Sequence, residues 1–151
     1  RAIYHGLPQA GLGGIRSGLS LAPRPSAVAA DALLDAIAAA RCDLIEADMG
    51  DDHAMVVDPV GHRLLGGVHA GSGRPLRTMV EELIGGPVLR SPILEHPLLL
   101  ALGPDRFELT IGQDVCLRFV ELDGDRLDLS FLGTFGFRLL EDRAGVAIEW
   151  T

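Results

Sequence analysis

The stretch FELTIGQDVCLRF, Phe107–Phe119, decides the fold that the sequence predicts. Apolar and polar residues alternate on both sides of Gly112-Gln113-Asp114, as in a strand, a break and a second strand. Gly112 can adopt backbone angles that are closed to other residues. Gln113 and Asp114 can hydrogen-bond the backbone groups that a bend leaves unpaired. We therefore interpret these three residues as fold-shaping and not as catalytic.

The composition indicates a folded domain with a substantial core. The chain has 151 residues, 48% of them hydrophobic, and a mean hydropathy of +0.27. Its net charge is −8, with 13 arginines and no lysine, which argues against nucleic-acid binding. No apolar run reaches ~18 residues, so the sequence predicts no transmembrane helix. Cys42 and Cys116 lack metal-ligand spacing and indicate a reducing, cytoplasmic location.

The first third of the chain reads as the end of one helix, a connector and a second helix. Gly6 is a natural helix stop in RAIYHGL, and the chain begins at Arg1, so we expect that sequence once preceded it. The segment APRPS, Ala22–Ser26, is expected to form a rigid extended connector. Ser26 is expected to cap a helix running from about Ala27 to Ala47.

The middle of the chain contains a short buried strand, Ala54–Val57, followed by two helices. Asp58 is a natural N-cap and Pro59 a natural first helical residue, which predicts a helix over Pro59–Leu65. Pro75 opens a second helix that ends near Ile84. The glycine-rich segment Gly66–Pro75 between the helices is predicted to be a loop.

The rest of the chain reads as β-structure, with Asp123–Asp125 as a hairpin turn. Helices followed by mostly antiparallel strands predict the α+β class. The expected strands are Val88–Arg90, Pro97–Leu102, Arg106–Ile111, Val115–Leu122, Arg126–Leu140 and Val146–Trp150.

No cluster of residues predicts catalysis, a cofactor or a metal. Asp51-Asp52-His53 is a conceivable metal site, but neighbouring residues in an extended segment point apart, so a solvated loop is the better interpretation. The glycine-rich segments lack the lysine of a P-loop and the spacing of a dinucleotide fingerprint. No serine lies in a G-x-S-x-G motif. The other histidines are scattered without ligand spacing and are expected to be structural or surface residues: His5, His62, His69 and His96.

The order of several segments resembles the encapsulins, the linocin-type shell proteins with the major-capsid fold of tailed phages. FELTIGQDVCLRF is similar to the family pattern FxLxxGQDLSIGY. The other similar segments, in order, are RAIYHGLPQAGLGGIR, DDHAMVVDPVGHRLL, GPVLRSPILEHPLLLALGPDRFEL and RLDLSFLGTFGFRLLEDRAGVAI. By this resemblance the chain would be a truncated or divergent member that lacks the N-terminal arm, the E-loop and most of the spine helix.

The resemblance implies a capsid-like A-domain with part of the P-domain sheet. Residues 1–26 would be the end of the spine helix and a connector, 27–102 approximately the A-domain, and 103–151 strands shared between the two domains. The loop that lines the shell pore would comprise Gly66, Gly67, His69, Gly71, Ser72, Gly73 and Arg74.

The same resemblance implies a structural role without catalysis. The chain would associate with copies of itself or with a full-length relative, and it would enclose a cargo protein in the cytoplasm, with no nucleic acid and no membrane involved. Two alternatives remain open from the residues alone: an interaction or regulatory module that keeps the capsid fold without forming a shell, and, with less support, a hydrolase.

Overall fold

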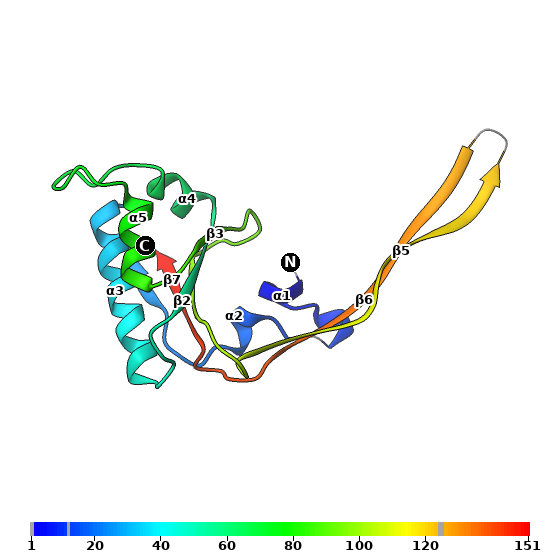
Figure 1. Cartoon of the computed structure of the whole chain (residues 1–151), viewed down its shortest axis with the longest axis horizontal. Helices are drawn as coiled ribbons and strands as arrows, with labels where there is room; N and C mark the ends of the chain where they lie inside the picture. Colours follow the sequence, from blue (N-terminus) through cyan, green and yellow to red (C-terminus); the bar gives the residue numbers. More distant parts are fainter. Residues whose placement is uncertain (1, 12, 124–125) are drawn as a thin grey trace.

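The computed structural model describes residues 2–11, 13–123 and 126–151, and it divides into two parts (Figure 1). The body is a five-stranded sheet with helices on both sides. The ribbon is a long two-stranded hairpin, β5 and β6, that leaves the body and extends far beyond it. The expected turn at Asp123–Asp125 falls largely outside the described residues.

The sheet of the body has the strand order β1-β7-β4-β2-β3. Its central pairs, β7 with β4 and β4 with β2, are antiparallel, whereas the edge pairs β1 with β7 and β2 with β3 are parallel. The bounds are Arg24–Ser26 for β1, His53–Val57 for β2, Val88–Arg90 for β3, Leu98–Ala101 for β4 and Gly145–Trp150 for β7.

The central strands are apolar on both faces because each face of the sheet meets its own core. Met55 and Val57 of β2 join the larger core under the helices, while Val56 between them joins a smaller core on the opposite face. In β4, Leu99 and Leu98 divide in the same way. A strand covered on both faces reads as a continuous apolar run, which is how HAMVV and LLLA appear in the sequence.

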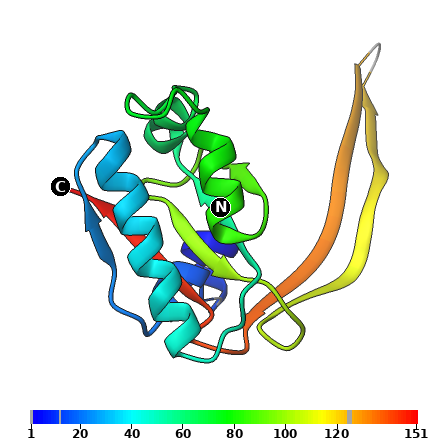
Figure 2. The same cartoon turned by 60° about the vertical axis from the view of Figure 1, so that its left-hand side comes forward.

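Two helices, α3 (Ala30–Glu46) and α5 (Leu76–Ile84), cover one face of the sheet (Figure 2). The prediction that Ser26 caps α3 was wrong. Ser26 ends strand β1, its hydroxyl donates to the Ala27 carbonyl at 3.0 Å, and the N-cap position is taken by Ala29 without a side-chain bond. The extended connector thus continues into a strand, because its backbone pairs with β7.

The short helix α4, Pro59–Leu65, begins as predicted. The Asp58 carboxylate accepts hydrogen bonds from the backbone amides of Val60 and Gly61, both at 3.1 Å, and Pro59 occupies the first helical turn. Asp58 is almost fully buried, and it also accepts the indole N–H of Trp150 at 3.2 Å. One carboxylate therefore joins the start of α4 to the end of β7.

The N-terminal segment covers the other face of the sheet at the root of the ribbon. It consists of α1 (Ala2–His5), the 3-10 turn Pro8–Ala10 and α2 (Ile15–Gly18). Gly6 ends α1 with a positive φ of 77°, as expected for a helix stop. Ile3 and Tyr4, together with Phe107 and Phe137 of the ribbon, pack against the smaller core, and burial raises the pKa of the Tyr4 hydroxyl.

The ribbon corrects one prediction. The two strands expected on either side of Gly112-Gln113-Asp114 are a single strand, β5 (Phe107–Asp123), which pairs antiparallel with β6 (Arg126–Leu139). The interruption seen in the sequence is present as shifts of register within a continuous ladder. A β-bulge of this kind bends a strand without ending it.

Candidate functional site: an apolar face on the ribbon

The bulges in β5 keep the apolar residues of the ribbon on one face. Between the pairs Ile111–Phe135 and Cys116–Leu132, β5 advances five residues while β6 advances three, in two successive shifts. Because two extra residues restore the alternation of the strand, Leu117 returns to the face of Ile111 and lies opposite Phe131. The stretch around Gly112 therefore changes which β6 residues lie opposite β5 and leaves the apolar side chains of β5 on one face.

We call this side of the ribbon the apolar face. Its members are large and solvent-exposed, with Phe131 exposed by 77% and Val115 by 69%. Cross-strand pairs such as Phe119 with Leu129 stack along it. The exposed members are Leu109, Ile111, Val115, Leu117, Phe119, Leu127, Leu129, Phe131 and Phe135.

The opposite face of the ribbon is mainly polar. The Arg138 guanidinium donates to the Glu108 carboxylate at 2.6 and 2.8 Å across the two strands. Arg118 pairs with Ser130, and Glu121 with Asp128, further along the ladder. The apolar face therefore carries few of the water-compatible side chains that a free ribbon would be expected to carry on both sides.

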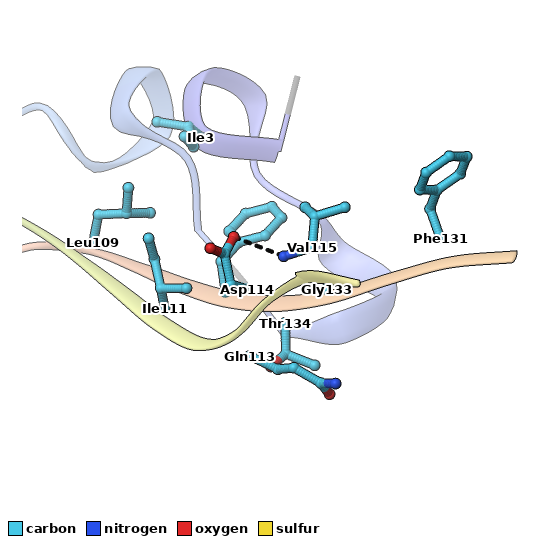
Figure 3. A pocket seen from close by; sticks show the side chains of 10 residues that line it. Ile3, Leu109, Ile111, Gln113, Asp114, Val115, Phe131, Gly133 and Thr134 are labelled. Carbon is cyan, nitrogen blue, oxygen red and sulfur yellow. Dashed lines mark hydrogen bonds between the residues drawn. The ribbon is translucent and has the colours of Figure 1, made fainter. Parts of the chain in front are cut away.

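A cleft lies where α1 approaches the apolar face (Figure 3). It encloses about 440 Å³, and Ile3 of α1 forms one wall while ribbon side chains form the other. Leu109, Ile111, Val115 and Phe131 all point to the side of the ribbon on which Ile3 lies. The remaining lining residues are Gln113, Asp114, Gly133, Thr134 and Phe135.

Two of the three predicted fold-shaping residues, Gln113 and Asp114, line this cleft. Asp114 points to the cleft side, and its carboxylate accepts the amide of Val115 at 2.7 Å. Gln113 points to the opposite face, and its amide nitrogen lies 3.2 Å from the sulfur of Cys116. Gly112, contrary to expectation, is not among the glycines with positive φ in the described residues. Its small size matters instead, because an added Cβ would lie 2.9 Å from the Thr134 hydroxyl.

The chemistry of this cleft suits binding. Among the described residues that line it there is one carboxylate, one amide and one hydroxyl, with no imidazole or thiol. These polar groups do not form the pair of a nucleophile and an adjacent base that covalent catalysis needs. An apolar wall beside a single carboxylate, Asp114, suits an apolar segment that also carries one cationic or N–H donor group.

The predicted pore-loop residues lie together in an ordered loop between α4 and α5. The Ser72 amide donates to Nδ1 of His69 at 3.1 Å, and Nε2 of that ring lies 3.2 Å from the Asp31 carboxylate of α3. The Arg74 guanidinium donates to both carboxylate oxygens of Glu82 at 2.7 Å. Gly73 turns with a φ of 65°. His69 and Arg74 thus contact acidic side chains on α3 and α5.

The interpretation of Asp51-Asp52-His53 as a solvated loop was wrong for its last member. Asp51 and Asp52 are exposed, but His53 begins β2 and is fully buried. The sequence of three adjacent polar residues did not indicate that the His53 side chain is buried beneath the helices. No group of three or more His, Cys, Asp or Glu side chains within the described ranges is placed to hold a metal ion.

Comparisons with known proteins agree with this architecture. The sequence model of the family described as "Encapsulating protein for peroxidase" matches residues 1–136. The chain is 30% identical over 150 residues to a type 1 encapsulin shell protein of Brevibacterium linens, and 22% identical over 148 residues to one of Rhodococcus erythropolis. The alignments cover 99% and 98% of this chain and 56% of each relative, so the chain spans about half the length of these proteins.

Solved structures show the same fold. A virus-like particle from Pyrococcus furiosus has a TM-score of 0.78 at 21% identity, covering 89% of this chain and 58% of the other. The capsid of Myoviridae phage XM1 has a TM-score of 0.74 at 15% identity, covering 97% and 57%. The fold is therefore that of phage-capsid proteins, with a partial sheet. Since the family match covers most of its length, the chain belongs to the linocin family of encapsulating proteins.

Proposed function

We propose that this chain is a structural shell subunit that associates through the apolar face of the ribbon. The observation that carries the proposal is the row of exposed large side chains on that face. A two-stranded hairpin alone in water is marginally stable, and a contiguous exposed apolar surface usually marks a contact with another molecule. The family supports the shell role, because its members are described as encapsulating proteins.

Each large side chain of the apolar face supplies a considerable driving force for association. Fully burying a residue of the size of Phe131 or Leu117 is worth roughly 1.5–3 kcal/mol. Both are more than half exposed in the single chain. Copies of the chain, or a longer relative, are the partners that the family suggests. The assignment of residues 1–26, 27–102 and 103–151 to capsid-type domains belongs to the same proposal.

A cargo protein is the second partner that we infer. The family description names a peroxidase, and the cleft between α1 and the ribbon has the chemistry to hold an apolar segment of such a protein. The carboxylate of Asp114 would favour a segment with a basic side chain beside its apolar ones. The free thiols of Cys42 and Cys116 fit work in a reducing compartment such as the cytoplasm.

The loop of Gly66, Gly67, His69, Gly71, Ser72, Gly73 and Arg74 is proposed to line a pore between subunits. It projects from the body at the end of α4 (Figure 1). Small residues permit symmetry mates to approach closely. Because the Arg74 guanidinium is paired with Glu82, its charge would not be left to repel its symmetry mates at an axis.

A pair of charged variants tests the role of the apolar face. Phe131→Asp places a carboxylate on this face, and Ser130→Asp places the same group on the opposite face one residue away. We expect particle mass, measured by sedimentation, to fall to that of single chains for Phe131→Asp and to stay unchanged for Ser130→Asp. Equal masses for the two variants would overturn the proposal. A wild-type chain that is a monomer or small oligomer would instead favour an interaction module.

A further inference from the structure

His53 is a buried ionisable group that the ribbon and its cleft do not use. It begins β2 and none of its surface is exposed. Alternation along the strand places its ring on the side of Met55 and Val57, in the core beneath α3 and α5. Within the described part of the chain, neither ring nitrogen has a hydrogen-bond partner. Unpaired buried polar groups of this kind are rare and costly.

Groups at the end of α5 and on α3 lie near this histidine. The end of α5 lies against the backbone of His53, since a Cβ on Gly86 would come within 2.1 Å of its carbonyl oxygen. The carbonyls of Ile84 and Asp51 lie near enough to act on the ring, although neither forms a hydrogen bond with it. On α3, Arg41 is four residues after the fully buried Ile37, and its Nε atom is buried without a partner among the described residues.

The charges that act on the ring oppose its protonation on balance. Arg41 is cationic and comes from α3, while Asp51, from the loop before β2, is exposed and 3.7 Å from the Arg41 guanidinium. β4, which pairs with His53 through Ala101, contributes no charge at this position. Burial is the main cause that lowers the pKa of His53. The Ile84 carbonyl opposes it, the charge of Arg41 adds to it, and the backbone and carboxylate of Asp51 oppose it with smaller effects.

We propose that His53 is an acid-sensitive switch. Its protonation places an unpaired cation near Arg41 and loosens α3 and α5 from the face of the sheet that carries His53. The folded protein holds the ring neutral, whereas the unfolded chain protonates near the ordinary histidine pKa of about 6.5. Stability is therefore complete above about pH 6.5 and declines as pH falls below it, where the unfolded state binds the additional proton. This inference concerns the folding of the body and stands whether or not the ribbon mediates assembly.

Chemical unfolding at pH 7.5 and pH 5.0 tests the switch. For wild type, the His53 contribution lowers the folding equilibrium constant by up to about tenfold for each pH unit below the onset. His53→Leu replaces the ring with an apolar side chain of similar size and removes the proton site. Between pH 7.5 and pH 5.0 we therefore expect the folding equilibrium constant of this variant to fall by a factor that is smaller than the wild-type factor by about tenfold or more. His62→Leu, on the exposed side of α4, is the matched control and should behave as wild type.

An NMR titration of histidine ring signals keeps the test decisive if His53→Leu does not fold. The wild-type signal of His53, assigned through its nuclear Overhauser contacts to Met55 or Ile84, should stay that of a neutral ring until the body begins to unfold. The same pH dependence in wild type and His53→Leu, or a His53 ring that titrates near pH 6.5 in a fully folded body, would overturn the proposal.

Discussion

Leu99 of β4 and Phe131 of β6 are both large apolar residues in strands, yet the first is fully buried in the body and the second exposes 77% of its surface on the ribbon. In the body, α3 and α5 cover one face of the sheet. On the ribbon, α1 approaches the apolar face at the cleft beside Ile3, and side chains farther along it such as Phe119 stay exposed. The difference indicates that body residues determine the stability of the single chain, while ribbon residues determine what the chain binds.

A core truncation should have the largest effect on stability. Ile37 of α3 is fully buried in the larger core, so Ile37→Ala leaves a cavity and should lower the free energy of unfolding by about 3–4 kcal/mol. Phe119→Ala on the apolar face removes more atoms, yet it should change the stability of the single chain by less than about 1 kcal/mol. Urea unfolding of both variants, under conditions that keep the chain monomeric, makes the comparison. Similar losses would show that the ribbon belongs to the folding core.

Removal of the Asp58 carboxylate should have an intermediate effect. Asp58→Ala leaves the amides of Val60 and Gly61 and the indole of Trp150 without their acceptor, and we expect a loss of about 2 kcal/mol. Asp58→Asn retains a side-chain oxygen for the helix cap and should lose less than half as much. Thermal unfolding of both variants measures the two losses of stability. An equal loss in both variants would mean that the charge of Asp58, and not its hydrogen bonding, stabilises the junction of α4 and β7.

The smallest effect is expected at the bulge. Gly112→Ala brings a methyl group to 2.9 Å from the Thr134 hydroxyl, which is the end of a side chain that can rotate away, so the cost should be less than about 1 kcal/mol. The double variant Gly112→Ala/Thr134→Ala removes the contact and should recover most of it. At Gly136, no described atom lies within 4 Å of an added Cβ, so Gly136→Ala tests the effect of alanine alone. No recovery in the double variant would place the cause in the backbone of Gly112.

Local signals in the sequence predicted much of the body. Asp58-Pro59 correctly marked the start of α4, and Val88–Arg90 is the strand β3 with the predicted bounds. Strand β1 was missed because its three residues, which include Pro25, become a strand only by pairing with β7 more than a hundred residues later. Nothing local to Arg24–Ser26 reports that partner.

The candidate site was harder to predict than the fold. Alternation around Phe107–Phe119 shows which residues share a face, but it does not show whether anything covers that face. The register shifts that unite the two expected strands depend on β6, so the sequence of β5 alone suggested a break. The burial of His53 could not be predicted from its neighbours in the sequence, because it depends on the tertiary packing of helices over β2.

The mass of the wild-type particle in solution, measured together with the intact mass of the chain, tests the central claim most directly. We expect large closed particles built from chains of 16.0 kDa, in which the apolar face of the ribbon is no longer accessible to a hydrophobic dye. A monodisperse monomer with its ribbon exposed to solvent would contradict it. That result would leave the capsid fold in place and remove the shell function from this chain.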